Sequence, residues 1–173
     1  GHEIIGIVKE VGSDVSKFKV GDNVGVGVYV DACEKCENCN SGKDHYCEEG
    51  IVLTYNSYEY GTRNITYGGY SKSIVVKENY VIKVPSDMDM AKAAPLLCAG
   101  ITTYSPLRHF KINSNHKVGI AGLGGLGHMG LKFASSFGAD VVVFSTSDSK
   151  KDEAFEMGAN HFVNVNNRED INK

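Results

Sequence analysis

The hydrophobic pattern of the chain changes near residue 86. Before that point, short β-branched runs and alternating valines are separated by glycines, and tyrosines crowd 55–80. Such alternation broken by glycine predicts a small β-rich domain, in which the tyrosines are expected to serve packing. The expected strands lie at 4–8, 51–54, 74–76 and 80–84, and the alternating valines are at 24, 26, 28 and 30.

From residue 86 onward the pattern favours helices and buried strands. Ser86–Ala91 carries capping residues for a helix start, and Pro95 indicates a break or a first-turn position. A further helical stretch is expected at 102–110. Apolar runs and helical spacings then predict strands at 117–121, 140–145 and 161–165, with helices at 126–137 and 149–157. This order is typical of a parallel, right-handed α/β unit.

Composition narrows the class of protein. The 173 residues allow one domain or parts of two, and 42% apolar with 23% charged residues excludes a disordered or fibrous chain. No run of 18 apolar residues appears, so no membrane span is expected. The net charge of −3 provides no basic field for nucleic acid or anionic lipid. No signal-peptide pattern follows the first residue, which is Gly.

Four of the five cysteines fall within fifteen residues, at the spacing C-x2-C-x2-C-x7-C. Repeated x2 spacings suit two disulfides poorly, whereas four thiolates on a tight loop suit tetrahedral zinc. Iron–sulfur ligation is the minor alternative. His45 lies inside the loop and is expected to be solvated. The pattern favours a closed, structural zinc site at Cys33, Cys36, Cys39 and Cys47.

A glycine-rich motif follows the first strand of the α/β unit and fits G-x-G-x-x-G. Its position between a strand and an amphipathic helix indicates a dinucleotide pyrophosphate loop, with the helix N–H groups facing the phosphates. A packing turn without a ligand is the alternative. The motif residues are Gly122, Leu123, Gly124, Gly125, Leu126 and Gly127.

The end of the second strand in this unit indicates which dinucleotide binds. An acidic residue there would bind a ribose 2′-hydroxyl, but the strand ends in Ser145, Thr146 and Ser147, followed by Lys150. Hydroxyls and a cation suit a 2′-phosphate, so the segment favours NADP over NAD. The alternative is that Ser147 or the nearest acid, Asp148, only caps the next helix.

Two further features carry little weight without context. The His2-Glu3 pair precedes the first strand, and Cys98 stands apart from the other cysteines. A free cysteine is most often a buried small apolar residue.

Longer motifs change that weighting. These motifs are Gly1-His2-Glu3-Ile4, Val20-Gly21-Asp22, the segment around Cys98 and the glycine loop with His128-Met129. Through them the chain resembles the zinc-dependent medium-chain alcohol dehydrogenases, and within them the cinnamyl alcohol dehydrogenase group. The resemblance covers essentially the whole chain in the family's order and spacing. It implies a partial GroES-like catalytic domain at 1–86, then linker helices and the first half of a Rossmann domain at 87–173.

The resemblance also implies roles for single residues. His2 and Cys98 match ligands of a catalytic zinc, and Glu3 matches an adjacent acid that can ligate transiently. The four-cysteine loop matches the family's structural zinc, and the serine-rich segment matches its NADP site. Thr102 is expected near the nicotinamide. The family's early cysteine ligand and its proton relay match no residue here and are expected upstream of residue 1.

The implied activity is hydride transfer between NADP(H) and a primary alcohol or aldehyde, with zinc polarising the substrate oxygen. An NAD-dependent zinc alcohol or polyol dehydrogenase is the first alternative. A zinc-free reductase of the same superfamily and a zinc-ribbon-like binding module are more remote. Small-molecule substrates, a cytoplasmic location and a homodimer of the full-length protein are expected, without nucleic-acid or membrane partners.

The motifs also lead us to expect an internal fragment of an enzyme about twice as long, since three strands are present of the six in a complete Rossmann sheet. The 173 residues alone are expected to be inactive and poorly stable, with unpaired sheet edges and an incomplete catalytic zinc site.

Overall fold

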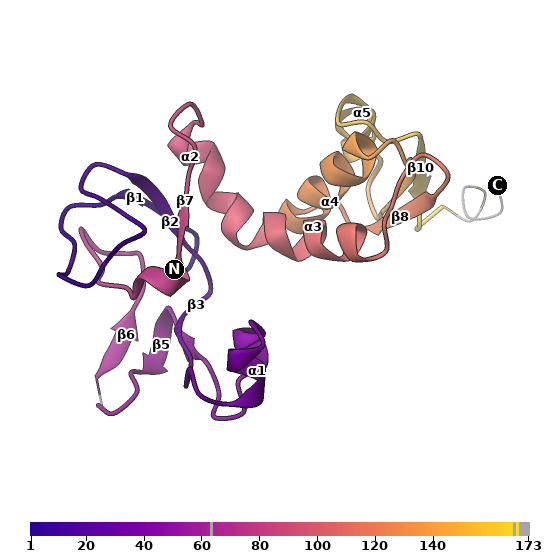
Figure 1. The fold of residues 1–173 in the computed structure, drawn as a ribbon. Coiled ribbons are helices and arrows are strands. Elements are labelled where there is room, and N and C mark those ends of the chain that lie inside the picture. The colour runs from indigo at the N-terminus through magenta and orange to yellow at the C-terminus, as the bar shows by residue number, and fades with distance from the viewer. Residues whose placement is uncertain (63, 168, 170–173) are drawn as a thin grey trace. The chain divides into compact units, whose positions relative to one another are not determined.

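A computed structural model describes residues 1–62, 64–167 and 169 of the chain. The chain forms two compact units, Gly1–Cys98 and Ala99–Lys173, shown in Figure 1. Each unit is described by itself. The domain limits expected from the sequence are 1–86 and 87–173, and these limits stay a prediction.

The first unit is built from short antiparallel strands. Its main sheet has the order β1-β2-β7, in which Ile4 pairs with Val26 and Val24 pairs with Lys83. Two further antiparallel strand pairs, β3–β4 and β5–β6, complete the strands of this unit. The strands are β1 Ile4–Ile7, β2 Asn23–Val26, β3 Tyr29–Asp31, β4 Val52–Leu53, β5 Tyr55–Tyr58, β6 Ile65–Tyr67 and β7 Val81–Lys83.

Short helices connect and follow these strands. Asp89 caps α2 by accepting from the backbone N–H groups of Ala91 and Lys92, as the sequence predicts, and Pro95 occupies the first turn of η3. The helices are α1 Glu37–Asn40, η1 Asp44–Tyr46, η2 Glu78–Tyr80, α2 Met90–Ala93 and η3 Ala94–Leu97.

Two expectations for this unit are wrong. Residues 74–76 form no strand, because the described chain offers them no pairing partner, and Val75 is fully exposed. The tyrosines do not all serve packing either, since the exposed fractions of Tyr67 and Tyr70 are 81% and 94%. β-branched or aromatic character alone decides neither strand formation nor burial, because a strand needs a pairing partner and a buried side chain needs a neighbouring layer.

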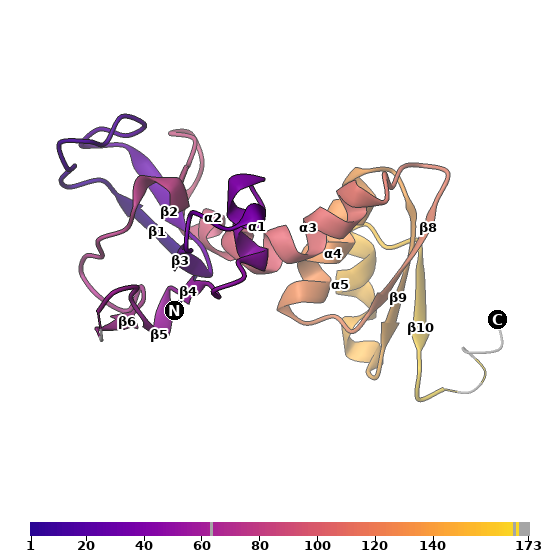
Figure 2. The same ribbon diagram turned by 60° about the horizontal axis from the view of Figure 1, so that its bottom comes forward.

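The second unit has the predicted parallel sheet, in the order β10-β9-β8. α4 and α5 cover one face of it, as Figure 2 shows, and bury a core that includes Leu131, Val141, Val143 and Ala154. The elements are α3 Ala99–His109, β8 Lys117–Ala121, α4 Gly125–Ser136, β9 Asp140–Ser145, η4 Asp148–Lys150, α5 Lys151–Glu156 and β10 His161–Asn164.

The packing of α4 differs from the apolar spacing in its sequence. Leu126 is 52% exposed, while the small residues Gly130 and Ala134 are buried. Phe133 packs instead against Tyr104 of α3, with ring centroids 5.3 Å apart. The helix therefore buries Gly130, Leu131 and Ala134, and it places the aromatic side chain of Phe133 against α3.

No helix in the described part of the chain has the length and apolar character needed to cross a bilayer.

Glu78 ties the loop at residues 16–17 to η2. Its Oε2 accepts from the backbone N–H groups of Ser16 and Lys17, at 3.1 and 2.9 Å. These hydrogen bonds, chiefly that from Lys17, hold the pKa of Glu78 below its ordinary value. The stabilisation is therefore present above the unfolded-state pKa, about 4.3, and is lost as the pH falls through the lower folded-state value.

We expect Glu78→Gln to lower the free energy of unfolding of the complete protein at pH 7 and to flatten its decline below about pH 5. Urea unfolding measured across this range checks it. Glu10→Gln, at another exposed glutamate, is the control and should keep the wild-type profile. Identical pH profiles for the two variants would contradict the prediction.

Candidate functional site

The four clustered cysteines come together in one lobe, formed by residues 33–50. Their sulfur atoms all lie within 4.8 Å of one another, and Cys33 Sγ is 3.8 Å from Cys39 Sγ. A tetrahedral ion with Zn–S bonds of about 2.3 Å requires sulfurs about 3.8 Å apart, whereas a disulfide requires about 2.05 Å. All five cysteines are free thiols. The lobe thus fits one tetrahedral zinc and excludes the disulfide alternative.

Backbone N–H groups already favour negative charge on some of these sulfurs. The backbone nitrogen of Cys33 lies 3.4 Å from Cys47 Sγ, and that of Cys36 lies 3.4 Å from Cys33 Sγ. Hydrogen bonding, chiefly from the backbone of Glu48, lowers the pKa of Cys36 to about 7, and the N–H of Cys33 lowers that of Cys47. Burial raises the pKa of Cys39, which a bound cation would reverse, since a coordinated thiol is deprotonated.

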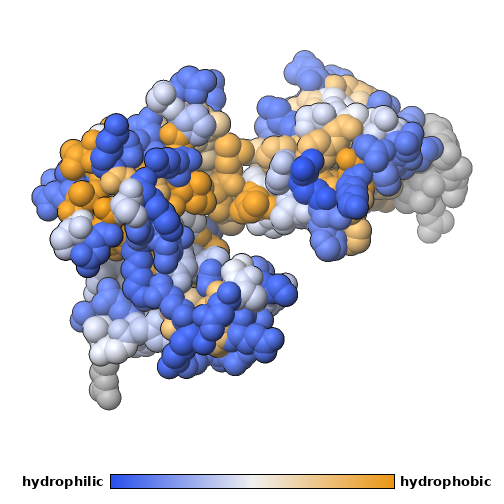
Figure 3. Space-filling model, viewed as in Figure 1, coloured by the Kyte–Doolittle hydropathy of each residue, from blue (hydrophilic) through white to orange (hydrophobic). Residues whose placement is uncertain are grey.

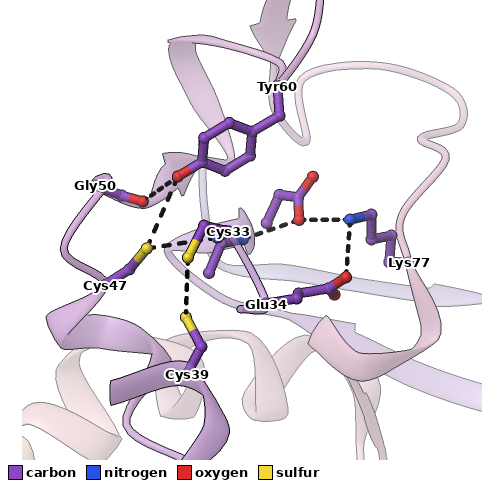
Figure 4. Close-up of polar contacts among 9 residues, drawn as sticks. Cys33, Glu34, Cys39, Cys47, Gly50, Tyr60 and Lys77 are labelled. Carbon is purple, nitrogen blue, oxygen red and sulfur yellow. Dashed lines mark hydrogen bonds and ion pairs between the residues drawn. The ribbon is translucent and has the colours of Figure 1, made fainter. Parts of the chain in front are cut away.

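Charged side chains fix the lobe at its start and its end. Lys77 Nζ lies 2.7 Å from Asp31 Oδ1 and 3.4 Å from Glu34 Oε2, as Figure 4 shows, and Lys35 pairs with Glu49 at 2.9 Å. The face of the lobe visible in Figure 3 is mainly hydrophilic. The lobe is therefore held by sulfur ligands and surface pairs rather than by an apolar core.

His45 lies in the lobe but outside the sulfur cluster. It is exposed, and its ring stacks at a tilt against Tyr46 with centroids 4.2 Å apart. This is the solvated position expected from the sequence.

The residues matched to a catalytic zinc all lie in the first unit. His2 precedes β1 and stacks on Tyr55, with centroids 5.6 Å apart, and Cys98 follows η3, which contacts β1 and β2. Glu3 is exposed. Among the described residues, only the four-cysteine set brings three or more potential ligand atoms within 4.8 Å of one another. The roles of His2, Glu3 and Cys98 stay a prediction.

A glycine turn holds the backbone next to His2. The N–H of Gly69 donates to the carbonyl oxygen of Gly1 at 2.9 Å. A Cβ at Gly68 would lie 2.5 Å from that same oxygen, and one at Gly69 would lie 2.5 Å from Ile4 Cγ1. The close approach requires glycine at both positions and fixes where the His2 backbone runs.

The glycine-rich motif forms the turn between β8 and α4. Gly122 has φ +86°, and α4 begins directly after Gly124. A Cβ at Gly127 would overlap the carbonyl oxygen of Gly122, whereas one at Gly124 would meet nothing within 4 Å. Gly124 therefore leaves open space in front of the helix N-terminus, as backbone approach to a pyrophosphate requires.

A groove of roughly 400 Å³ lies between this turn and the end of β9. Lys150 Nζ donates to the carbonyl oxygen of Leu123 at 2.8 Å, so the cation lies directly on the glycine loop. The sequence places Lys150 after the strand but gives no sign of this contact. The groove is lined by Ala121, Gly122, Leu123, Gly124, Phe144, Ser145, Thr146, Lys150 and Val165.

Local hydrogen bonds occupy several polar groups beside the groove. Ser147 caps η4 by accepting from the N–H of Ser149 at 3.3 Å, which is the capping alternative seen in the sequence. Asp148 Oδ2 accepts from Asn164 Nδ2 at 2.8 Å and does not line the groove. Ser145 is buried and bonds to the backbone of Ser147. Thr102 lies exposed in the first turn of α3.

A β-rich unit with a tetrathiol lobe, followed by a parallel α/β unit with a dinucleotide-type turn, defines a metal-containing, nucleotide-dependent class of protein. Residues 1–86 match the alcohol dehydrogenase GroES-like domain, and residues 125–173 match the zinc-binding dehydrogenase domain. The chain belongs to the zinc-dependent medium-chain alcohol dehydrogenase family, which confirms the expected family and fold class.

Individual relatives agree with this assignment. The chain is 51% identical over 175 residues to "NADP-dependent alcohol dehydrogenase C 1" of Mycolicibacterium smegmatis, covering 100% of this chain and 50% of the relative. It is 52% identical over 162 residues to a probable formaldehyde dehydrogenase of Bacillus subtilis, covering 94% and 46%. The chain thus spans about half the length of the curated relatives it matches.

A solved structure gives the same result. The cinnamyl alcohol dehydrogenase of Helicobacter pylori, complexed with NADP(H), superposes with a TM-score of 0.91 at 49% sequence identity. The match covers 95% of this chain and 47% of that one.

Proposed function

We propose that the complete protein is a zinc-dependent alcohol dehydrogenase or aldehyde reductase that transfers hydride between NADP(H) and a primary alcohol or aldehyde. The observation that carries the cofactor choice is the position of Lys150 on the glycine loop, beside Ser145 and Thr146 in one groove. The NADP-dependent relative and the NADP(H) complex of the solved relative support it.

Different residues of the groove bind the pyrophosphate and the 2′-phosphate of NADP. The N–H groups that begin α4 face the pyrophosphate, and Gly124 keeps the approach open. Lys150 and the exposed Thr146 meet the 2′-phosphate, since a cation and a hydroxyl both donate to phosphate oxygens. Asp148 bonds to Asn164, so the acid that would select a ribose diol is engaged elsewhere.

His2 and Cys98 would hold a catalytic zinc, with Glu3 beside it. An imidazole and a thiol in one compact unit are suitable zinc donors, and the stack on Tyr55 and the Gly68-Gly69 turn orient the His2 segment. When bound, this zinc supplies a Lewis acid for the substrate oxygen. Small-molecule alcohols, a homodimer and a cytoplasmic location belong to the same proposal and rest on the family.

The proposal is tested on the complete protein by metal content and by turnover with both nucleotides. We expect two zinc per subunit and a preference for NADPH over NADH across a small panel of aldehydes. A preference for NADH would overturn the cofactor assignment, and a protein without zinc would overturn the metal-dependent chemistry.

We expect Lys150→Met to weaken NADPH binding by about tenfold or more, since a charge-assisted hydrogen bond contributes about 1.5–3 kcal/mol. NADH binding should change little because NADH lacks the 2′-phosphate. Quenching of protein fluorescence on titration with each nucleotide measures both affinities. Lys151→Met is the matched control, because the adjacent lysine does not line the groove. Equal losses for NADPH and NADH would contradict the assigned contact.

A further inference from the structure

One side chain outside the four-cysteine lobe contacts its sulfur cluster. Tyr60 follows β5, thirteen residues beyond Cys47. Its hydroxyl bonds to the carbonyl oxygen of Gly50 and lies 3.8 Å from Cys47 Sγ, as Figure 4 shows. Neither the cysteine spacing nor the glycine motif predicts this contact.

Cys47 is the cysteine that lies farthest along the chain from the other three ligands. The other three cysteines lie within residues 33–39, with α1 beginning directly after Cys36. Cys47 is reached only after seven further residues, at the end of η1, and begins a turn in which the N–H of Gly50 donates to its carbonyl at 3.0 Å. Tyr60 contacts both ends of this turn, so it joins the fourth sulfur to the β5–β6 hairpin.

The chemistry of a zinc-bound sulfur assigns the direction of this contact. A coordinated thiolate carries no proton, so the proton between the two groups belongs to the Tyr60 hydroxyl. That proton is shared between Gly50 O and Cys47 Sγ. The N–H of Cys33 is a second donor to the same sulfur, at 3.4 Å. Outer hydrogen bonds of this kind orient metal ligands and tune their affinity.

We propose that Tyr60 is a positioning residue for the structural zinc. Its hydroxyl holds Cys47 Sγ in the tetrahedral set and thereby slows both zinc loss and reaction of this thiolate with electrophiles. The inference rests on zinc occupying the lobe, as the proposed function requires.

The test uses the complete, zinc-loaded protein with Tyr60→Phe, which removes only the hydroxyl. A Cys98→Ser background is expected to remove the proposed catalytic zinc, so that only the zinc of the lobe is followed. We expect zinc transfer to a chromogenic chelator to be about tenfold faster than with Tyr60 present. Tyr58→Phe is the control, because this tyrosine lies on the same hairpin, is 65% exposed and makes no hydrogen bond to the lobe among the described residues. It should release zinc at the parent rate.

A residue-specific measurement separates positioning from general loosening. Pulsed iodoacetamide labelling followed by mass spectrometry should show faster alkylation of Cys47 in Tyr60→Phe, with Cys36 changed much less. Equal acceleration at both cysteines, or zinc release at the parent rate, would overturn the inference while leaving the proposed function standing. A parent protein that holds no zinc in the lobe would overturn the inference and the expected count of two zinc per subunit.

Discussion

Replacing Cys39 by serine in the complete protein is expected to remove the zinc of the lobe and to unfold residues 33–50 locally. None of these eighteen residues is fully buried, and their two helices have four and three residues. Helices this short are not stable alone, and no apolar core compensates. The metal therefore supplies the ordering energy, and we expect the free energy of unfolding to fall by roughly 3 kcal/mol or more.

Metal analysis and limited proteolysis check this expectation. Cys39→Ser should hold one zinc fewer per subunit and should be cleaved inside the lobe under conditions in which the parent resists. Cys98→Ser is the matched control, since it should lose the other zinc and the activity while the lobe stays protected. If Cys39→Ser kept its metal and its resistance, the four sulfurs would not be what orders the lobe.

The sequence predicts the four-cysteine site well because all four ligands come from one short segment. A local spacing is enough when the chain has only to close on itself around one ion. The contacts that fix the lobe from outside are different. Tyr60 and Lys77 reach it from later segments, and their positions follow from strand pairing that no local pattern encodes.

The same distinction explains the errors in the expected fold. The parallel strands are recognised because each is an apolar run between turn residues, but residues 74–76 show the same composition without becoming a strand. In α4, the periodicity of large apolar residues suggests a single buried face. The buried face instead combines the small residues Gly130 and Ala134 with Leu131, and Phe133 lies against Tyr104 of α3.

The glycine motif shows what the structure adds to a recognised pattern. From the sequence, the three motif glycines receive roles by analogy with other nucleotide-binding turns. In the structure, Gly122 needs its positive φ, Gly127 needs the absence of a Cβ for packing, and Gly124 needs neither for folding. Gly124 has φ −101° and ψ −161°, which other residues adopt readily, so a glycine there points to the ligand rather than to the fold.

We therefore expect Gly127→Ala and Gly124→Ala to fail in different ways in the complete protein. The new methyl at residue 127 overlaps the carbonyl oxygen of Gly122, so α4 must move away from the turn, at a cost of about 1–3 kcal/mol in the free energy of unfolding. NADPH affinity should fall with it, because the same turn lines the groove.

Gly124→Ala should leave the free energy of unfolding within about 0.5 kcal/mol of the parent, since its methyl meets no protein atom within 4 Å. It should nevertheless weaken NADPH binding by at least about tenfold, because the methyl occupies the space that the pyrophosphate requires. Urea unfolding and nucleotide titration of both variants give the comparison. Parent-like NADPH binding by Gly124→Ala would mean that the open space before α4 is not the pyrophosphate site, and that the groove binds its nucleotide in another position.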